Sequence, residues 1–333
     1  MNLKEQILDL SRQNNLGPLS PFIDKLLDEQ IADGVFLHTL ELEQVRDSIV
    51  TFLTNYREQT GRGTVVLGMS GGVDSALTAA LFKEAGWLVV GFTLPIDQNP
   101  EETHRGIEAC TALGVEHRHV DLTKLYYETL LQLSLVTGGD IKLTERDQSH
   151  TTKIRRGNIR ARLRMITLYN MASALNGVVA STDNFSELNA GFWTLHGDVG
   201  DLSPIQSLLK SWEVPYLSSI SGVPESTYRA TPTDGLGIGA GDEAQLGGSY
   251  LEWDIMVNAM IKYDLDRLRP TINESGDDRA IAIMRSVTSR LGATWFKRMN
   301  PVNVPHPFFP ERYEQLAGLD CEFQPAVVGG YKD

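Results

Sequence analysis

Residues 68–75, GMSGGVDS, place three glycines, two serines and one acid in a short run with no lysine. The apolar run TVVLG comes before it and ALTAALFKEAG follows it, which predicts a strand, a loop and then a helix. Glycines let the backbone approach a ligand closely, and the free N–H groups at a helix start attract anions. The expected occupant of this loop is a phosphate or a pyrophosphate.

The loop differs from the common phosphate-binding motifs. It lacks the lysine of GxxxxGK[ST] and the spacing of GxGxxG. An acid beside an anion site makes electrostatic sense if Asp74 holds a magnesium ion that also touches the phosphates. The alternative is an ordinary strand-to-helix turn in which Asp74 caps the helix. The pattern SGGxDS resembles the PP-loop ATP pyrophosphatases, a group that includes amide-forming ligases and sulfur-inserting tRNA enzymes.

The segment 155–165, RRGNIRARLRM, carries arginines on two faces of a predicted helix. Arg156, Arg160 and Arg164 form one i, i+4 stripe, which is interpreted as a solvated face or as partners of acidic groups. Arg162 is expected on the apolar side, beside Ile166. An unpaired guanidinium is costly there, so either a structural ion pair or a bound anionic ligand is expected.

The segment 181–210 follows a predicted strand and is rich in hydroxyls and acids. Ser181, Thr182 and Asp183 stand at the carboxyl end of the strand, and plain helix capping is an open alternative for them. Glu187 follows on the next turn, where it could share a cation with Asp74.

Five motifs together give a more specific resemblance. They are GMSGGVDS, GNIRARLRM, STDNFSELNAGFWTLHGDVGDLSPI with Lys210, TPTDGL and DEAQLGGSYLEWD. In their order and spacing, from about residue 40 to 300, they resemble the ammonia-dependent NAD synthetases. The resemblance implies that ATP is a co-substrate, that Mg²⁺ is a cofactor and that deamido-NAD is the acceptor.

The resemblance also assigns residues to each ligand, by position in this sequence. For ATP they are Gly68, Met69, Ser70, Gly71, Gly72, Val73, Asp74, Ser75, Thr182, Lys210 and Thr233. For deamido-NAD they are Arg162, Asp201 and Lys297, and for magnesium Asp74 and Glu187. No residue is assigned as a covalent nucleophile.

Two positions depart from the family pattern. Leu195-His196 stands where a Lys-Tyr pair is common, and the turn GDVGD is one residue shorter than the usual form. Near residue 296 the family has a His-Lys element, but here Phe296 replaces the histidine and Lys297 alone is carried over. The far end of the acceptor is therefore expected to be held differently.

Short apolar runs alternate with helical runs between residues 64 and 182, which predicts a parallel sheet with helices on both faces. The expected fold is an α/β, Rossmann-like doubly wound sheet of the adenine nucleotide alpha-hydrolase type. Ligands in such sheets bind beyond the carboxyl ends of the strands, which singles out loops 69–75, 95–100 and 182–187.

Three regions are expected around that sheet. Residues 1–38 are interpreted as an N-terminal helical appendage, residues 39–302 as the catalytic domain and residues 303–333 as a C-terminal tail. Within the domain, residues 213–248 are rich in Gly, Pro and Ser, and we interpret them as a lid loop over the nucleotides, with a disordered linker as the alternative.

Composition limits the classes of protein that remain. A net charge of −13 argues against a nucleic-acid partner, and no run of about 18 apolar residues predicts a membrane span. The start of the chain does not resemble a secretion signal, so a cytoplasmic location is expected. Cys110 and Cys321 are far apart, which argues against a disulfide framework.

The predicted reaction is ATP-dependent amidation of deamido-NAD through an acyl-adenylate, with release of AMP and pyrophosphate. The 60-odd residues before the first strand are too few for a glutamine-hydrolysing domain, so ammonia is the expected nitrogen source. The resemblance implies a homodimer. The alternatives are a related PP-loop amide ligase acting on nicotinate mononucleotide or another nucleotide, a sulfur-inserting tRNA enzyme, and a non-catalytic nucleotide-binding protein.

Overall fold

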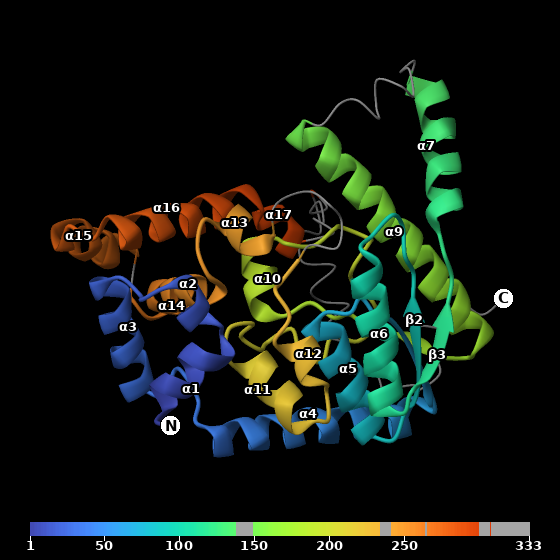
Figure 1. Cartoon of the computed structure of the whole chain (residues 1–333), viewed down its shortest axis with the longest axis horizontal. Coiled ribbons are helices and arrows are strands. Elements are labelled where there is room, and N and C mark those ends of the chain that lie inside the picture. Colours follow the sequence, from blue (N-terminus) through green and yellow to red (C-terminus); the bar gives the residue numbers. More distant parts are fainter. Residues whose placement is uncertain (138–148, 234–240, 264, 300–306, 308–333) are drawn as a thin grey trace.

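The computed structural model, which describes residues 1–137, 149–233, 241–263, 265–299 and 307, contains a four-stranded parallel sheet. The strand order is β3–β2–β1–β4 (Figure 1). The strands are β1 (Thr64–Gly68), β2 (Leu88–Thr93), β3 (Glu116–His119) and β4 (Val178–Val179). In the centre of the sheet, Val65 pairs with Val89 on one side and with Val178 on the other. The carboxyl ends of β1 and β4 therefore lie side by side.

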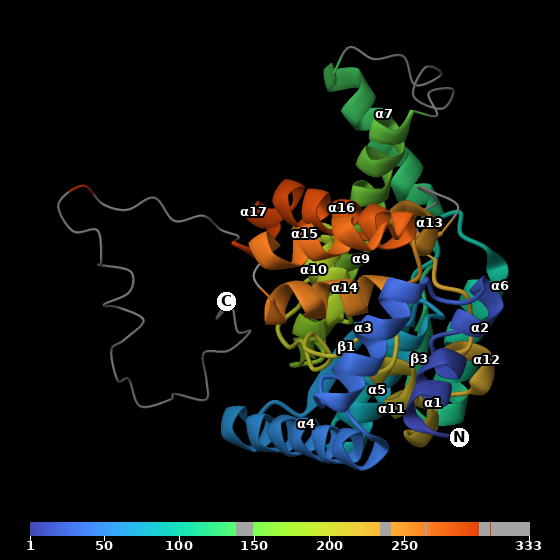
Figure 2. The same cartoon turned by 90° about the vertical axis from the view of Figure 1, so that its left-hand side faces the viewer.

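Helices cover both faces of the sheet, because both faces of its central strands are apolar. Val65 and Leu67 belong to a core formed with α4, α5, α6 and α11, whereas Val66 belongs to a second core formed with α7 and α9. The bounds of these helices are α4 (Thr39–Thr60), α5 (Val73–Glu84), α6 (Pro100–Leu113), α7 (Thr123–Thr137), α9 (His150–Ala174) and α11 (Glu213–Ile220). The expected doubly wound α/β fold is confirmed. Figure 2 shows α7 and the first half of α9 standing out from the body of the protein.

The remaining helices surround this core. They are α1 (Leu3–Leu10), α2 (Gln13–Leu16), α3 (Pro21–Ala32), α10 (Phe185–Ala190), α12 (Glu225–Tyr228), α13 (Asp242–Leu246), α14 (Tyr250–Lys262), α15 (Leu265–Ser275), α16 (Asp278–Ala293) and α17 (Trp295–Arg298). Of these, α3, α15 and α16 pack with α14, whereas α12 packs on α5, α6 and α11. None of the helices in the described part of the chain combines the length and the apolar character that a membrane span requires.

The N-terminal helices are built into the main core. Ile7, Ile23 and Leu27 are fully buried in the same cluster as the strand residues Val65 and Leu67. Helix α3 packs along α14, where the Nε2 atom of Gln30 donates to the carbonyl of Ile255 at 2.8 Å. Residues 1–38 therefore share apolar contacts with the domain that carries the sheet.

The region expected to be a lid loop is largely helical where the structure describes it. In α11, which packs on α4 and α5, Val214 and Leu217 are buried, and α12 follows at 225–228. These helices are difficult to predict from a sequence rich in Ser, Pro and Gly, because each is too short to show a helical period of apolar residues. Residues 234–240, within the expected lid, and residues 303–306 and 308–333 of the expected tail lie outside the described residues.

Leu27→Ala tests the attachment of the N-terminal helices. Leu27 is fully buried, so its truncation should lower the free energy of unfolding by about 2–5 kcal/mol. Leu16→Ala is the matched control, because that side chain is 51% exposed. Urea denaturation of both variants measures the difference, and equal stabilities would contradict the shared core.

Candidate active site

The loop after β1 is held in one conformation by contacts on both sides. Gly71 has a φ of +86°, and a Cβ atom there would lie 2.1 Å from the carbonyl oxygen of Glu102. Gly72 is the N-cap of α5, and the Oγ atom of Ser75 donates to its carbonyl at 3.0 Å. A side chain at Gly71 would force α6 away, so the glycine is needed for both its backbone angle and its size.

A cavity of about 500 Å³ lies beyond the carboxyl ends of the strands. The predicted residues that line it are Gly68, Met69, Ser70, Gly71, Gly72, Val73, Asp74, Thr182, Glu187, Lys210, Thr233 and Lys297. Ser75 lies behind the loop, with its Oγ atom 3.2 Å from that of Ser70. Phe92, Leu94, Met165 and Leu168 supply an apolar wall. The cavity thus has a polar end at the loop and an apolar part suited to a flat ring system.

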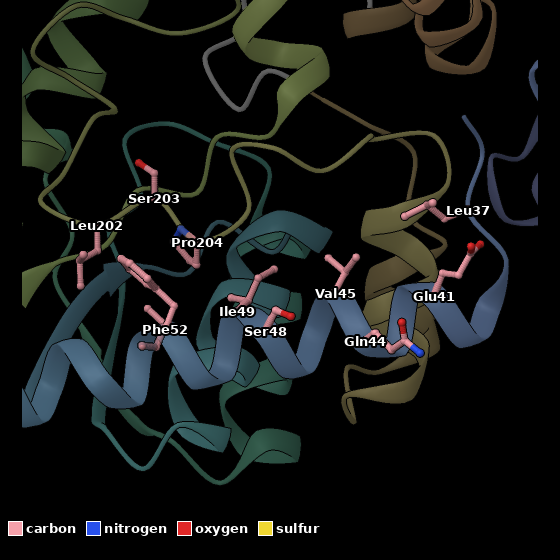
Figure 3. A pocket seen from close by; sticks show the side chains of 11 residues that line it. Leu37, Glu41, Gln44, Val45, Ser48, Ile49, Phe52, Leu202, Ser203 and Pro204 are labelled. Carbon is pink, nitrogen blue, oxygen red and sulfur yellow. The ribbon is translucent and has the colours of Figure 1, made fainter. Parts of the chain in front are cut away.

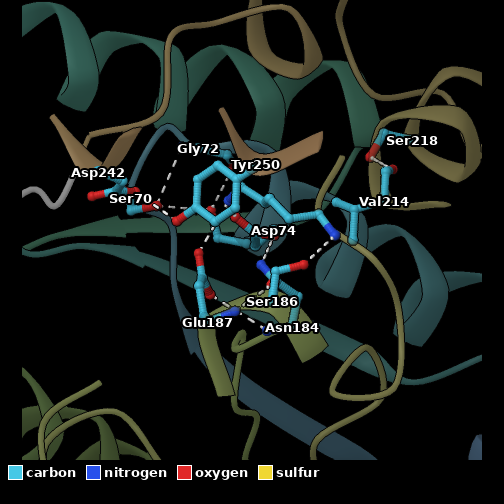
Figure 4. Close-up of polar contacts among 12 residues, drawn as sticks. Ser70, Gly72, Asp74, Asn184, Ser186, Glu187, Val214, Ser218, Asp242 and Tyr250 are labelled. Carbon is cyan, nitrogen blue, oxygen red and sulfur yellow. Dashed lines mark hydrogen bonds and ion pairs between the residues drawn. The ribbon is translucent and has the colours of Figure 1, made fainter. Parts of the chain in front are cut away.

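Two carboxylates and one ammonium group meet at the polar end of the cavity (Figure 4). The Nζ atom of Lys210 forms ion pairs with Asp74 and with Glu187, the latter at 3.1 Å. Asn184 links the same acids: its amide donates to Asp74 at 2.9 Å, and its oxygen accepts from the backbone N–H of Glu187 at 3.0 Å. Asp74 therefore contacts Asn184 and Lys210, which are more than 100 positions away in the chain.

Burial dominates the electrostatics of this cluster. It raises the pKa of Glu187 to about 7, although Lys210 opposes the shift. Burial would lower the pKa of Lys210, but Asp74 and Glu187 together raise it above its ordinary value. Lys210 is therefore charged at neutral pH and balances the two acids.

The two acids have the chemistry that magnesium requires. Carboxylate oxygens are preferred Mg²⁺ ligands, and Mg²⁺ is commonly bound by one or two carboxylates together with substrate phosphates. Asp74 and Glu187 already converge on one cationic group next to the phosphate loop. No group of three or more His, Cys, Asp or Glu side chains suited to a metal occurs in the described ranges, so the remaining ligands would come from a nucleotide and water.

The backbone around Lys210 is fixed by buried polar side chains. The N–H of Lys210 donates to the Oγ atom of Ser186 at 3.0 Å, and the N–H of Ser211 donates to Asp254 at 3.1 Å. On the other side, Glu213 accepts from the N–H of Leu209 at 2.9 Å. Burial raises the pKa of Asp254 to about 6 and that of Glu213 to about 7. Both acids thus accept hydrogen bonds from the backbone on either side of Lys210.

The arginines of α9 face the opposite way from the expectation. Arg164 lies on the buried side of the helix, where it donates to the carbonyl of Leu94 at 3.1 Å and to the Gln98 side chain at 2.9 Å. Arg162 is exposed and donates to the carbonyl of Leu195 at 3.2 Å. The helical period indicates the wrong side because the apolar residue Ile166 is 66% exposed, whereas the small residues Gly157 and Ala161 are buried.

Asp201 also lies outside the residues that line the cavity. It accepts from the N–H of Val179 at 2.8 Å and from the hydroxyl of Tyr169 at 3.1 Å. Arg162 and Asp201 are thus placed on the outer side of α9, and their contact with an acceptor stays a prediction.

Lys297 lines the cavity, whereas Leu195, His196 and Phe296, which depart from the expected pattern, are not among its lining residues. Lys297 donates to the carbonyls of Gly191 and Trp193, the first at 2.6 Å, whereas Phe296 is 42% exposed. Burial lowers the pKa of Lys297. Lys297 is therefore held against the backbone of the loop that follows α10.

Sequence reasoning missed several residues of the site. Asn184 could have been found, because Asn184 and Glu187 stand at capping-box spacing. Tyr250 and Asp242, which share a hydrogen bond of 3.1 Å in the cluster, carried no local signal. Arg105 lines the cavity and donates to Gly71, a contact that only the packing of α6 creates.

Comparison with known proteins places the chain in a family. The sequence profile of the NAD synthase family matches residues 45–301. An NH(3)-dependent NAD(+) synthetase of Methanosarcina mazei is 34% identical over 272 residues, which cover 79% of this chain and 98% of that protein. The chain belongs to the NAD synthase family.

Solved structures of similar proteins share the fold. An NMN synthetase of Francisella tularensis has a TM-score of 0.63 at 23% identity and covers 80% of this chain and 98% of its own. An NH3-dependent NAD synthetase of Campylobacter jejuni has a TM-score of 0.59 at 24% identity and covers 79% and 99%. These two proteins thus share the fold of this chain.

Glu213→Gln tests how ionisation of the buried Glu213 side chain changes the free energy of unfolding. Since burial raises the folded-state pKa of Glu213 to about 7, its contribution to stability is present below the unfolded pKa of about 4.5 and is lost as the pH rises through 7. The variant should lack this loss, which is up to about 3 kcal/mol between pH 4.5 and 8. Chemical denaturation across that range measures it, and parallel curves for both proteins would contradict the assignment.

Proposed function

We propose that this NAD synthase family member converts deamido-NAD to NAD with ATP and ammonia, through an acyl-adenylate. One observation carries the proposal: Asp74 and Glu187, from the first turns of two different helices, meet at one cation at the SGGVDS motif. The curated relative from Methanosarcina mazei is named an NH(3)-dependent NAD(+) synthetase, which supports ammonia as the nitrogen source.

The reaction needs an activated carboxylate. An oxygen of the nicotinate carboxylate attacks the α-phosphorus of ATP, the bond to the β-phosphate oxygen breaks, and pyrophosphate leaves with the electron pair. Ammonia then attacks the acyl carbon and loses a proton, and AMP departs with the acyl oxygen. The N–H groups of residues 70–73 bind the phosphates, and the buried cation of Lys210 offsets negative charge near them.

Asp74 and Glu187 are the residues that would hold magnesium. When bound, the ion would neutralise phosphate charge and help to orient the triphosphate. Lys210 already occupies the space between the two carboxylates, so it keeps them together despite their mutual repulsion. Thr182 and Thr233 line the same cavity and are proposed to contact ATP.

Asp74→Asn tests this assignment. The variant keeps the side-chain volume but removes one negative charge, so AMP formation should fall by at least about 100-fold, the size of a lost charge interaction in catalysis. Purified protein is incubated with ATP, Mg²⁺, ammonium and deamido-NAD, and the products are separated by chromatography. Asp97→Asn is the control, because Asp97 does not line the cavity.

The same assay decides the acceptor. Nicotinate mononucleotide replaces deamido-NAD in a parallel reaction, because one structural neighbour is an NMN synthetase. Amide formation from deamido-NAD supports the proposed function. Its absence with both acceptors, in a protein that remains folded, would overturn it.

We also propose that the protein is a homodimer that uses the outer side of α9 and the groove along α4. The groove, of about 610 Å³, is lined by α4 residues, by Leu37 and by Leu202, Ser203 and Pro204 (Figure 3). Phe52 in the groove is 60% exposed and Ile166 on α9 is 66% exposed. Asp201 joins the two areas, because it precedes Leu202 and accepts from Tyr169 of α9. A second copy would cover this apolar surface.

Ile166→Glu tests the dimer. A charge in an apolar interface should convert a two-chain species to single chains, because an unpaired carboxylate is costly to bury. Leu135→Glu on α7 is the control, as Leu135 is 67% exposed and lies away from the groove. Sedimentation velocity gives the masses, and single chains in the unaltered protein would refute the proposal.

A further inference from the structure

Arg105 stands beside the phosphate loop with most of its hydrogen-bonding capacity unused. It is half-buried, lines the cavity and donates through Nε to the carbonyl of Gly71 at 3.3 Å. Its Nη1 and Nη2 groups donate to no residue in the described part of the chain, and no described carboxylate forms an ion pair with it. In a chain with a net charge of −13, such an unpaired guanidinium next to a cavity is unusual.

The position of Arg105 is fixed by the packing of α6 on the loop. Glu102, Arg105 and Gly106 have i, i+3, i+4 spacing, so they share one face of the helix. The carbonyl of Glu102 closes on Gly71, and a Cβ atom at Gly106 would lie 2.5 Å from the carbonyl of Met69. This close approach depends on the absence of side chains at Gly71 and Gly106, and it places the guanidinium at the edge of the loop.

The other strong cations that line the cavity are occupied by protein groups. Lys210 is paired with two acids, and Arg164 is bound to Leu94 and Gln98. Arg290 donates to the carbonyls of Ala190 and Gln245, at 3.4 and 3.1 Å. Lys297 donates to the carbonyls of Gly191 and Trp193. Among the described residues, Arg105 is thus the cavity cation that contacts the loop and retains free donors.

We propose that Arg105 binds the β- and γ-phosphates of ATP and stabilises the negative charge of the departing pyrophosphate. A guanidinium can donate two parallel hydrogen bonds to phosphate oxygens, which suits its free Nη groups. The α-phosphate keeps a single charge in the acyl-adenylate, whereas pyrophosphate leaves with several, so a fixed cation at the loop acts mainly on pyrophosphate. Arg105 would thereby supply the charge that a lysine provides in GxxxxGK[ST] loops. The assignment rests on the proposed ATP-cleaving function.

Calorimetry with inorganic pyrophosphate and with AMP, each with Mg²⁺, tests this role. Arg105→Gln keeps an N–H donor for Gly71 but removes the charge, and Arg105→Lys keeps the charge. Pyrophosphate should bind about 10- to 100-fold more weakly to the Gln variant, the size of a lost charge-assisted contact, and less weakly to the Lys variant. The affinity for AMP should be unchanged. His104→Ala, at the exposed neighbouring position of α6, is the matched control.

Three outcomes would overturn the proposal. They are equal losses for AMP and pyrophosphate in the Gln variant, equal pyrophosphate affinities of the Gln and Lys variants, and no pyrophosphate binding by the unaltered protein. The first two would mean that Arg105 only pins the carbonyl of Gly71. Since the titrations contain neither acceptor nor ammonia, a failure to form NAD would refute the proposed function and leave this test intact.

Discussion

The ion cluster of Asp74, Lys210 and Glu187 is the interaction on which the rest of the site depends. Two carboxylates at one point repel each other, and burial favours the protonated form of Glu187. Lys210 opposes that preference by bringing a buried positive charge between them. Without it, Glu187, whose pKa is already raised to about 7 by burial, would bind a proton more readily and lose its affinity for a metal ion.

The fold satisfies this constraint by bringing three separate chain segments together. Strands β1 and β4 are parallel neighbours, so the loops after them begin at the same edge of the sheet. Asp74 then lies in the first turn of α5 and Glu187 in the first turn of α10. Asn184 contacts both acids, and the buried Ser186 and Asp254 hold the backbone that carries Lys210. The packing of α10 and α14, which carry Ser186 and Asp254, thus influences the electrostatics of the site.

Much of this arrangement could be predicted from the sequence, because its signals are local. The strand and helix around SGGVDS follow from apolar runs and glycines, and the parallel sheet follows from their alternation. Which side of α9 is buried could not be predicted from the sequence. Arg164 and Ile166 both lie close to apolar residues on the helix surface, so the buried side depends on the elements that pack against it. The role of Arg105 is hidden for a similar reason, since its contact with Gly71 joins residues that are 34 positions apart.

Helix α9 separates two environments that an acceptor with a nucleotide tail would have to join. Met165 and Leu168 face the cavity, whereas Arg162 and Tyr169 lie on the outer side of the helix. The turn from Thr194 to Asp201 links the two sides, because Thr194 lines the cavity and Asp201 contacts Tyr169. This turn contains GDVGD, the segment that the sequence predicts to be one residue shorter than the common family form. A shorter turn between Thr194 and Asp201 would change how the far half of the acceptor is bound. It would leave the phosphate loop unaltered.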